Sequence, residues 1–140
     1  MKKSPAQEAW RLLWDFMLEN RRRFLHAVAE LGLSPPQAFA LRHMDPDRPV
    51  TMSELADVLF CDASNVTGLV DRLEARGIVE RRADERDRRV KTVVFTPEGL
   101  ELRERIVALM NEPPPAITGL SRKDQQALLE IFERATATAA

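Results

Sequence analysis

Residues 51–99, TMSELADVLFCDASNVTGLVDRLEARGIVERRADERDRRVKTVVFTPEG, decide the fold of this chain. Their first half contains two short helical patterns that meet at a tight turn near residues 59–61. Their second half contains two β-rich runs, 78–82 and 91–96, which a polar and charged stretch connects. This order predicts a helix-turn-helix followed at once by a β-hairpin with an exposed, arginine-rich tip. One helix and the hairpin tip should therefore lie at the same edge of a small domain.

Capping residues predict where the two short helices begin and end. Thr51 or Ser53 can begin the first helix, and Asp62 or Ala63–Ser64 can begin the second, since the oxygens of threonine, serine and aspartate side chains accept hydrogen bonds from free helix amides. Gly77 stands where a glycine ends the second helix in the left-handed conformation. The tight turn between the helices is consistent with a helix-turn-helix.

Further helical patterns flank this central segment. Residues 6–31 predict one long helix, Ser34 caps the next, Pro97 begins a helix over about 97–111, and Ser121 begins a last one. The long helix carries apolar side chains on more than one face, which is more than a single buried stripe requires. We expect the extra face to pack on a second subunit, although a helix enclosed within one domain would look similar. The predicted fold class is mainly α with a small β-hairpin.

Length and composition describe a single globular domain. The chain has 140 residues, of which 44% are hydrophobic and 31% charged, as in soluble proteins. Charged residues interrupt the long helix, and the N-terminus lacks the apolar core of a signal peptide, so we expect a cytoplasmic protein with no membrane span. The one cysteine, Cys61, excludes an intrachain disulfide and a zinc site with two cysteine ligands. We interpret Cys61 as a packing residue and expect no cofactor and no metal.

The distribution of charge is more informative than its sum. The net charge of −1 argues against a general binder of polyanions. Residues 76–91 nevertheless contain seven basic and four acidic side chains. Because salt screens each charge over roughly 8–10 Å, a local excess of this kind can act on nucleic acid independently of the total.

The segment from Leu55 to Gly99 resembles the winged helix-turn-helix of the MarR family of bacterial transcription regulators. The hairpin, or wing, carries the strongest part of the resemblance, in Asp84, Asp87, Arg88 and Arg89 followed by the run FTPEG at 95–99. The resemblance implies a single domain over 1–140, in which 34–99 form a winged helix-turn-helix lobe and 5–33 and 100–138 form dimerisation helices.

Two positions depart from the common pattern of the family. Phe60 occupies the turn, where a glycine is frequent, and would strain a left-handed backbone there. Gly68 lies within the second short helix, where a larger polar side chain is often seen. The first departure affects the geometry of the turn, and the second removes one contact with DNA.

The resemblance implies that the helix beginning near Ala63 enters the major groove of DNA. Asn65 can bind adenine through two hydrogen bonds, and Arg88 is expected to insert in the minor groove. The side chains expected to contact DNA are Ser53, Ser64, Asn65, Thr67, Arg72, Arg86, Arg88, Arg89 and Lys91. We expect Asp84 and Asp87 to hold the neighbouring arginines by charge-assisted hydrogen bonds and so to order the tip. In the alternative, Ser64 is only a helix cap and Asn65 only a solvated residue.

The predicted function is a sequence-specific, DNA-binding transcriptional regulator, usually a repressor in this family, that acts as a homodimer. Its operator would be a pseudopalindrome with half-sites about 10 base pairs apart. The resemblance also implies a small aromatic or apolar effector, and Trp14, Arg42 and His43 are candidates to border its pocket.

Two other classes of function were weighed against this prediction. A winged-helix module for protein interaction would keep the fold without specific DNA readout, and Gly68 and the negative net charge give it some support. An enzyme is not expected, because the chain offers no nucleophile–base pair, glycine-rich phosphate loop or metal constellation.

Overall fold

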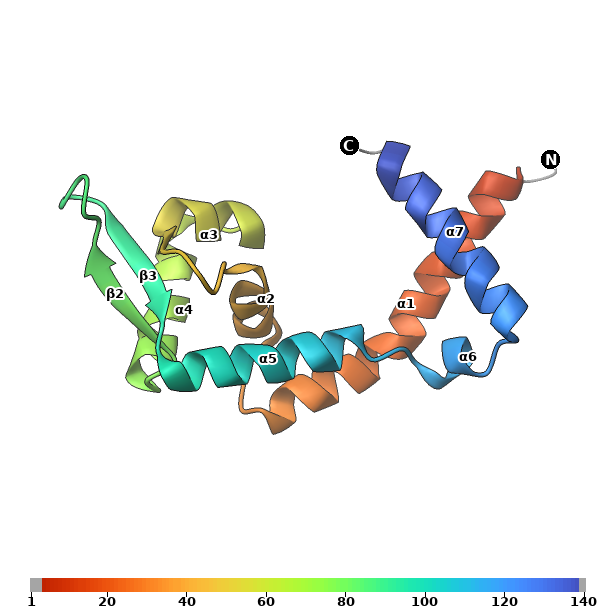
Figure 1. Cartoon of the computed structure of the whole chain (residues 1–140), viewed down its shortest axis with the longest axis horizontal. Helices are drawn as coiled ribbons and strands as arrows, with labels where there is room; N and C mark the ends of the chain where they lie inside the picture. The colour runs from red at the N-terminus through yellow and green to blue at the C-terminus, as the bar shows by residue number, and fades with distance from the viewer. Residues whose placement is uncertain (1–3, 139–140) are drawn as a thin grey trace. The chain divides into compact units, whose positions relative to one another are not determined.

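The computed structural model describes residues 4–138 and is mainly helical, as predicted (Figure 1). In chain order the described elements are α1 (Pro5–Glu30), α2 (Pro35–His43), β1 (Val50–Thr51), α3 (Met52–Leu59), α4 (Ala63–Ala75), β2 (Val79–Ala83), β3 (Lys91–Phe95), α5 (Pro97–Asn111), α6 (Pro115–Thr118) and α7 (Arg122–Thr138). None of the helices in this part of the chain combines the length and the apolar character that crossing a membrane requires.

The chain divides into two compact units, Met1–Met110 and Asn111–Ala140. The first unit contains α1 to α5 and the sheet, and the second contains α6 and α7. The predicted division into a lobe over 34–99 and dimerisation helices at 5–33 and 100–138 stays a prediction.

Side-chain caps begin the helices of the first unit. Ser34 and Thr51 each accept a hydrogen bond from the amide three residues later, and the side chain at that third position bonds back to the amide of the cap. The Asp62 carboxylate accepts from the Asn65 amide and begins α4. Among the alternatives left by the sequence, Thr51 and Asp62 are therefore the caps, because their oxygens reach the third amide of the helix. Gly77 follows α4 with a φ of 70°, as predicted for a glycine that ends a helix.

The sheet has one strand more than the sequence predicted. Strand β3 lies between β1 and β2 and is antiparallel to both, so that Val50 faces Val93 and Val79 faces Phe95. Strand β1 is only two residues long, which is too short to produce a recognisable alternation of apolar and polar residues. Because β1 leads directly into α3, it ties the base of the wing to the helix-turn-helix.

The core of the first unit lies among α2, α3, α4, α5 and the inner face of the sheet. Its largest fully buried side chains include Leu41, Leu55, Leu73 and Ile106. Helix α1 joins this core only through its C-terminal part, where Val28 is buried and Phe24 and Leu31 pack beside it.

The other apolar residues of α1 do not reach this core. Toward the N-terminus of the helix, Trp10 is 66% exposed and Met17 57% exposed. The apolar residues predicted on several faces of the long helix thus fall into two groups. Those near the C-terminus pack on the core, and those near the N-terminus are exposed.

A close backbone contact joins the hairpin to α5. The Thr96 hydroxyl lies 2.5 Å from the Gly77 carbonyl oxygen and 3.1 Å from the Ile78 carbonyl oxygen, and it accepts a hydrogen bond from the Gly99 amide at 3.0 Å. A Cβ atom built on Gly99 would stand 1.8 Å from the Ile78 carbonyl oxygen. The close approach therefore requires glycine at position 99, and it fixes the first turn of α5 against the chain that leaves α4.

Replacement of Gly99 by alanine should destabilise the fold. The new methyl group must push the first turn of α5 away from Ile78, which we expect to lower the free energy of unfolding by about 2–3 kcal/mol. Gly68→Ala is the matched control, because a Cβ there meets only the Arg72 Nη1 atom, at 3.6 Å. That change should raise stability by up to about 1 kcal/mol, since alanine favours a helix more than glycine does. Urea denaturation of both variants tests this, and equal stability of Gly99→Ala and the natural chain would contradict the packing described.

Candidate nucleic-acid interface

The first turn of α4 presents an ionised cap and two exposed polar side chains. The Oδ1 atom of Asp62 accepts from the Asn65 amide at 3.0 Å and from the Ser64 hydroxyl at 2.8 Å. The backbone hydrogen bond from Asn65, followed by the one from Ser64, lowers the pKa of Asp62 below its usual value of 3.8. The cap therefore stays negatively charged at neutral pH. Ser64 supports the cap, whereas the Asn65 side chain projects from the first turn.

One stripe of α4 runs from Asn65 through Gly68 to Arg72. Residues at these spacings lie on one face of a helix. All three expose part of their surface, and the Arg72 guanidinium reaches back over Gly68, where its Nη1 atom would lie 3.6 Å from a Cβ atom. Arg72 also lines a cavity of about 490 Å³ with Ser34 and Arg76. Ser53 on α3 and Thr67 on α4 are exposed as well.

Arg81 attaches the wing to α4. Its guanidinium forms an ion pair with Asp71, a second with Glu74 at 2.9 Å, and a hydrogen bond to the Thr67 carbonyl oxygen at 3.2 Å. The Arg81 amide also donates to Glu74, at 2.8 Å. The hydrogen bond that the Arg81 guanidinium donates to the Asp71 carboxylate is the largest cause that raises the pKa of Arg81 above its ordinary value. This arginine of β2 therefore holds the wing strand along α4 and is not available to DNA.

Two more basic residues of the segment 76–91 have internal partners. The Arg76 guanidinium donates to the Gly32 carbonyl oxygen at 2.5 Å and to the Leu31 carbonyl oxygen at 3.3 Å, at the end of α1. Arg82 pairs with Glu80 at 3.0 Å. The remaining basic residues are exposed and have no side-chain partner within residues 4–138, and these are Arg86, Arg88, Arg89 and Lys91.

Aspartates order the wing tip through its backbone. Asp84 accepts from the Arg86 amide at 2.7 Å, and Asp87 accepts from the Arg89 amide at 3.1 Å. The two carboxylates thus bond to the neighbouring arginines through their backbone amides, because short side chains in a tight turn reach the amide two residues on more readily than a guanidinium. The ordering of the tip is retained, and the guanidinium groups stay available.

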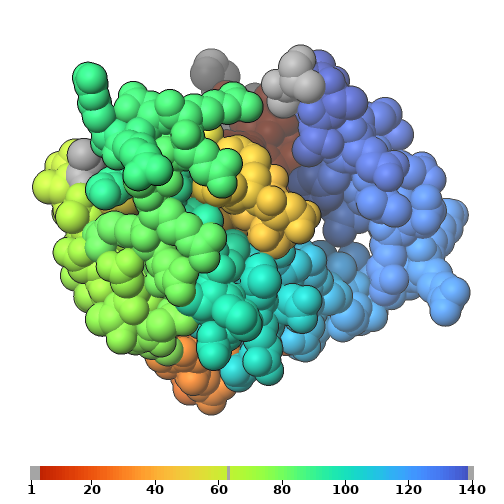
Figure 2. Space-filling view, turned by 60° about the vertical axis from the view of Figure 1, so that its left-hand side comes forward, coloured from red at the N-terminus to blue at the C-terminus, as the bar shows by residue number. Residues whose placement is uncertain are grey.

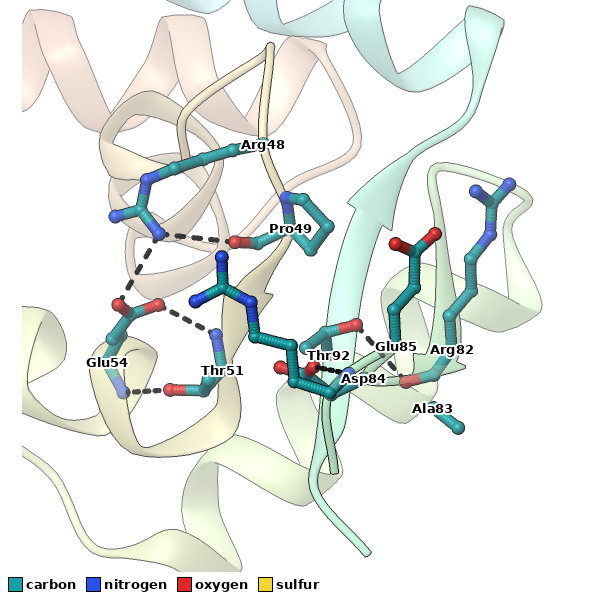
Figure 3. A pocket seen from close by; sticks show the side chains of 10 residues that line it. Arg48, Pro49, Thr51, Glu54, Arg82, Ala83, Asp84, Glu85 and Thr92 are labelled. Carbon is teal, nitrogen blue, oxygen red and sulfur yellow. Dashed lines mark hydrogen bonds and ion pairs between the residues drawn. The ribbon is translucent and has the colours of Figure 1, made fainter. Parts of the chain in front are cut away.

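The wing and the start of the helix-turn-helix enclose a cavity of about 510 Å³ (Figure 3). Arg48, Thr51 and Glu54 line one side, and Arg82 and Arg86 are among the residues on the other. Glu54 accepts from the Thr51 amide at 2.8 Å and lies 3.5 Å from the Arg48 guanidinium. Sequence reasoning missed Arg48, because its position beside the wing depends on the pairing of β1 with β3.

The interface elements lie on one side of the first unit. Figure 2 shows the green wing next to the yellow-green start of α4. The nine side chains predicted to contact DNA are all exposed. Their contacts with DNA stay predictions.

Of the three candidates for an effector pocket, Trp14 lies on α1, and Arg42 and His43 are consecutive residues of α2. The Trp14 ring is 6.4 Å from the Trp10 ring, between centroids, and Trp14 is 53% exposed. His43 places its Nδ1 atom 2.8 Å from the Phe39 carbonyl oxygen, and the Arg42 carbonyl oxygen accepts from Arg103 at 3.5 Å. Other residues line the two cavities described above. The effector pocket stays a prediction.

Comparisons with known proteins place this architecture in one group. The sequence model of the MarR family matches residues 31–90. The chain is 25% identical over 120 residues to the organic hydroperoxide resistance transcriptional regulator of Bacillus subtilis, covering 86% of this chain and 79% of the relative. It is 35% identical over 91 residues to the transcriptional repressor MprA of Escherichia coli, covering 63% of this chain but only 50% of MprA. It likewise spans 57% and 58% of the length of two further Bacillus subtilis regulators.

A solved structure shares the fold over almost the whole chain. Wild-type MarR from Escherichia coli, in its apo form, superposes with a TM-score of 0.77 at 22% identity, covering 96% of this chain and 98% of MarR. The hairpin, the helix-turn-helix and the flanking helices are thus the parts of a known architecture. The chain belongs to the MarR family of winged helix-turn-helix transcriptional regulators.

Proposed function

We propose that this regulator binds double-stranded DNA as a homodimer, with α4 in the major groove and the wing tip in the adjacent minor groove. One observation carries the proposal: the wing, which Figure 2 shows on the same face of the first unit as the start of α4, carries four exposed cations without internal partners. Three other basic residues of the same segment are used inside the fold. An exposed cationic hairpin tip has no structural use that would explain it, whereas phosphates and a narrow minor groove attract such groups.

Each predicted side chain has a role in this proposal. Asn65 reads a base edge, Ser64 and Ser53 contact phosphates or sugars, and Arg72 contacts a phosphate further along the groove. Arg88 enters the minor groove. The same mode assigns backbone contacts to the other exposed polar groups, Thr67, Arg86, Arg89 and Lys91.

Exposed apolar side chains support the homodimer. On α1 and, separately, on α7, large hydrophobic residues remain between 42% and 66% exposed, namely Trp10, Leu12, Trp14, Met17 and Leu18, and Leu129, Ile131 and Phe132. Contiguous apolar surface of this kind is uncommon on a monomer and is typical of an interface. Two-fold pairing would present two α4 helices to a pseudopalindrome, with half-sites about 10 base pairs apart.

Repression and release by a small aromatic or apolar effector complete the proposal. The relative MprA is named a repressor, which supports the same mode here. Another relative is named for resistance to organic hydroperoxides. Cysteine-based sensors of peroxide in this family carry the reactive thiol near the first helix, whereas the one cysteine here is Cys61, in the turn before α4. A non-covalent ligand is therefore the effector class that we propose, and a cytoplasmic location follows from the DNA target.

Selection from random duplex DNA tests the function directly. The full chain should enrich a pseudopalindrome, and fluorescence anisotropy should show specific binding that weakens as salt rises. If no sequence is enriched, or if selected and random duplexes bind with equal affinity, the chain does not recognise a specific DNA sequence and the proposed function is wrong.

Arg88→Ala should weaken binding to the selected duplex by about tenfold and reduce the salt slope by about one. The loss arises because one cation leaves the minor groove. Arg11→Ala is the control, since Arg11 lies on α1 and is already paired with Glu8 and Asp15. Anisotropy titrations at several salt concentrations measure both quantities, and an unchanged slope for Arg88→Ala would remove Arg88 from the interface.

Asp62→Asn should strengthen DNA binding by about two- to fivefold at low salt. Asparagine caps a helix as well as aspartate does, so the change removes a charge near the phosphates and keeps α4 intact. Because the pKa of Asp62 is lowered by folding, its ionised cap is fully stabilising above pH ~3.8 and is lost as pH falls through the folded-state pKa. The variant should therefore show less acid sensitivity of unfolding. Weaker binding by a variant of unchanged stability would show that DNA does not approach this end of α4.

Trp10→Glu should convert a dimer into a monomer without loss of helicity. The natural chain should sediment at about twice its 15.9 kDa. A carboxylate in the apolar contact would carry an uncompensated desolvation cost, whereas the exposed Trp10 ring adds little to the fold of one chain. Val90→Ser, which alters a 37% exposed residue of the wing, is the control and should remain dimeric. Sedimentation equilibrium and circular dichroism measure both properties, and a natural chain that is monomeric at micromolar concentration would refute the dimer.

A further inference from the structure

Phe60 adopts a conformation that its side chain does not favour. It is the only non-glycine residue with positive φ in the described part of the chain, with φ 50° and ψ 39°. The backbone alone supports this turn, because the Phe60 amide donates to the Asp57 carbonyl oxygen at 3.3 Å and the Cys61 amide donates to the Ala56 carbonyl oxygen at 3.2 Å. Glycine would make the same bonds without the clash between Cβ and the backbone.

The Phe60 side chain also gains nothing from burial. It is 97% exposed, well above the 66% of Trp10, the next most exposed large hydrophobic residue within residues 4–138. A phenylalanine ring usually stabilises a protein by leaving water, and this ring remains in it. Both the backbone conformation and the exposure to water therefore disfavour phenylalanine at this position. We infer that the ring contacts another molecule and does not stabilise the single chain.

The position of Phe60 indicates what the ring contacts. It lies two residues before Asp62, the cap of α4, and thus at the same end of the helix as Ser64 and Asn65. A helix of 13 residues is about 20 Å long, so the other end of α4 is remote from it. If the first turn of α4 enters the major groove, the ring must lie against the wall or floor of that groove.

The surroundings of the ring do not form an apolar protein interface, although the carboxylates beside it would repel phosphates. Its exposed neighbours Asp57 and Asp62 are acidic, and the nearest exposed apolar residue in sequence, Val58, is only 37% exposed. A single ring among carboxylates is not the contiguous apolar patch that a protein interface uses. In the major groove, by contrast, the thymine methyl group and the deoxyribose offer small apolar surfaces, and phenylalanine is a known partner of the thymine methyl.

We propose that Phe60 is a DNA-contacting residue whose ring packs on apolar surface of the major groove beside the bases that α4 contacts. The inference rests on the DNA binding proposed above. The contact is apolar, so it contributes affinity without releasing counterions. It differs in this respect from the contact of Arg88, and salt dependence separates the two.

The test replaces Phe60 by glycine and measures stability and DNA binding on the duplex selected by the natural chain. Phe60→Gly should raise the melting temperature by about 2–5 °C, because the strain and the exposed ring are both removed. It should weaken binding to the selected duplex by about 5- to 20-fold with an unchanged salt slope. A gain in stability together with a loss of affinity cannot come from a merely structural role.

Duplexes with uracil in place of thymine identify the surface that the ring contacts. If the ring packs on a methyl group, uracil at one position should weaken binding by the natural chain and leave Phe60→Gly unaffected. If it packs on deoxyribose, uracil should change neither protein, while the loss caused by Phe60→Gly remains. Both results support the proposal.

Leu100→Ser is the matched control, since Leu100 is 38% exposed and follows Gly99, which packs on Ile78 at the C-terminal end of α4. This control should bind the selected duplex as the natural chain does. Equal affinity of Phe60→Gly and the natural chain would overturn the inference while leaving DNA binding in place. Failure of the natural chain to select any duplex would instead overturn the proposed function.

Discussion

The ion pairs and hydrogen bonds of Arg81 with α4 are the interaction on which the arrangement of the interface depends. The guanidinium joins a wing strand to two carboxylates and one carbonyl of the helix, and Arg81 is only 24% exposed. A two-stranded hairpin has little stability of its own and needs a partner to define its direction. Arg81 provides that partner on one side and β1 on the other. The separation between the wing tip and the first turn of α4 is thus set within one chain.

Local signals explain how much of this architecture the sequence could predict. Ser34, Asp62 and Gly77 act on amides or carbonyls a few residues away, and Pro97 starts its helix through its own fixed φ, so a short stretch of sequence is enough to recognise each of them. The hairpin followed from two β-rich runs around a polar tip. The extra apolar face of residues 6–31 indicated a second subunit, and the resemblance to the family then added the grooves of DNA and the role of Arg88, which periodicity and composition do not contain.

Contacts between distant parts of the chain explain what the sequence could not predict. Arg76 bonds to carbonyls 44 and 45 residues earlier, and nothing near position 76 indicates this use. Strand β1 exists only because β3 lies beside it. The sequence therefore showed that residues 76–91 have an excess of basic side chains. It did not show that three of the seven bond within the fold and that four remain exposed. The hydrogen bond of Asp84 was also not predictable in detail, although its partner is only two residues away. The sequence places both the amide and the guanidinium of Arg86 near this carboxylate, and the structure shows that the amide donates to it.

The contact between Gly99 and the Ile78 carbonyl has a mechanical consequence. The first turn of α5 packs directly on Ile78, three residues after the end of α4. The Thr96 hydroxyl adds hydrogen bonds to the Ile78 carbonyl oxygen and from the Gly99 amide. Packed corners of this kind transmit strain, because close-packed interiors resist compression. A tilt of α5 would therefore act as a lever on the end of α4 and swing its opposite tip through the larger arc.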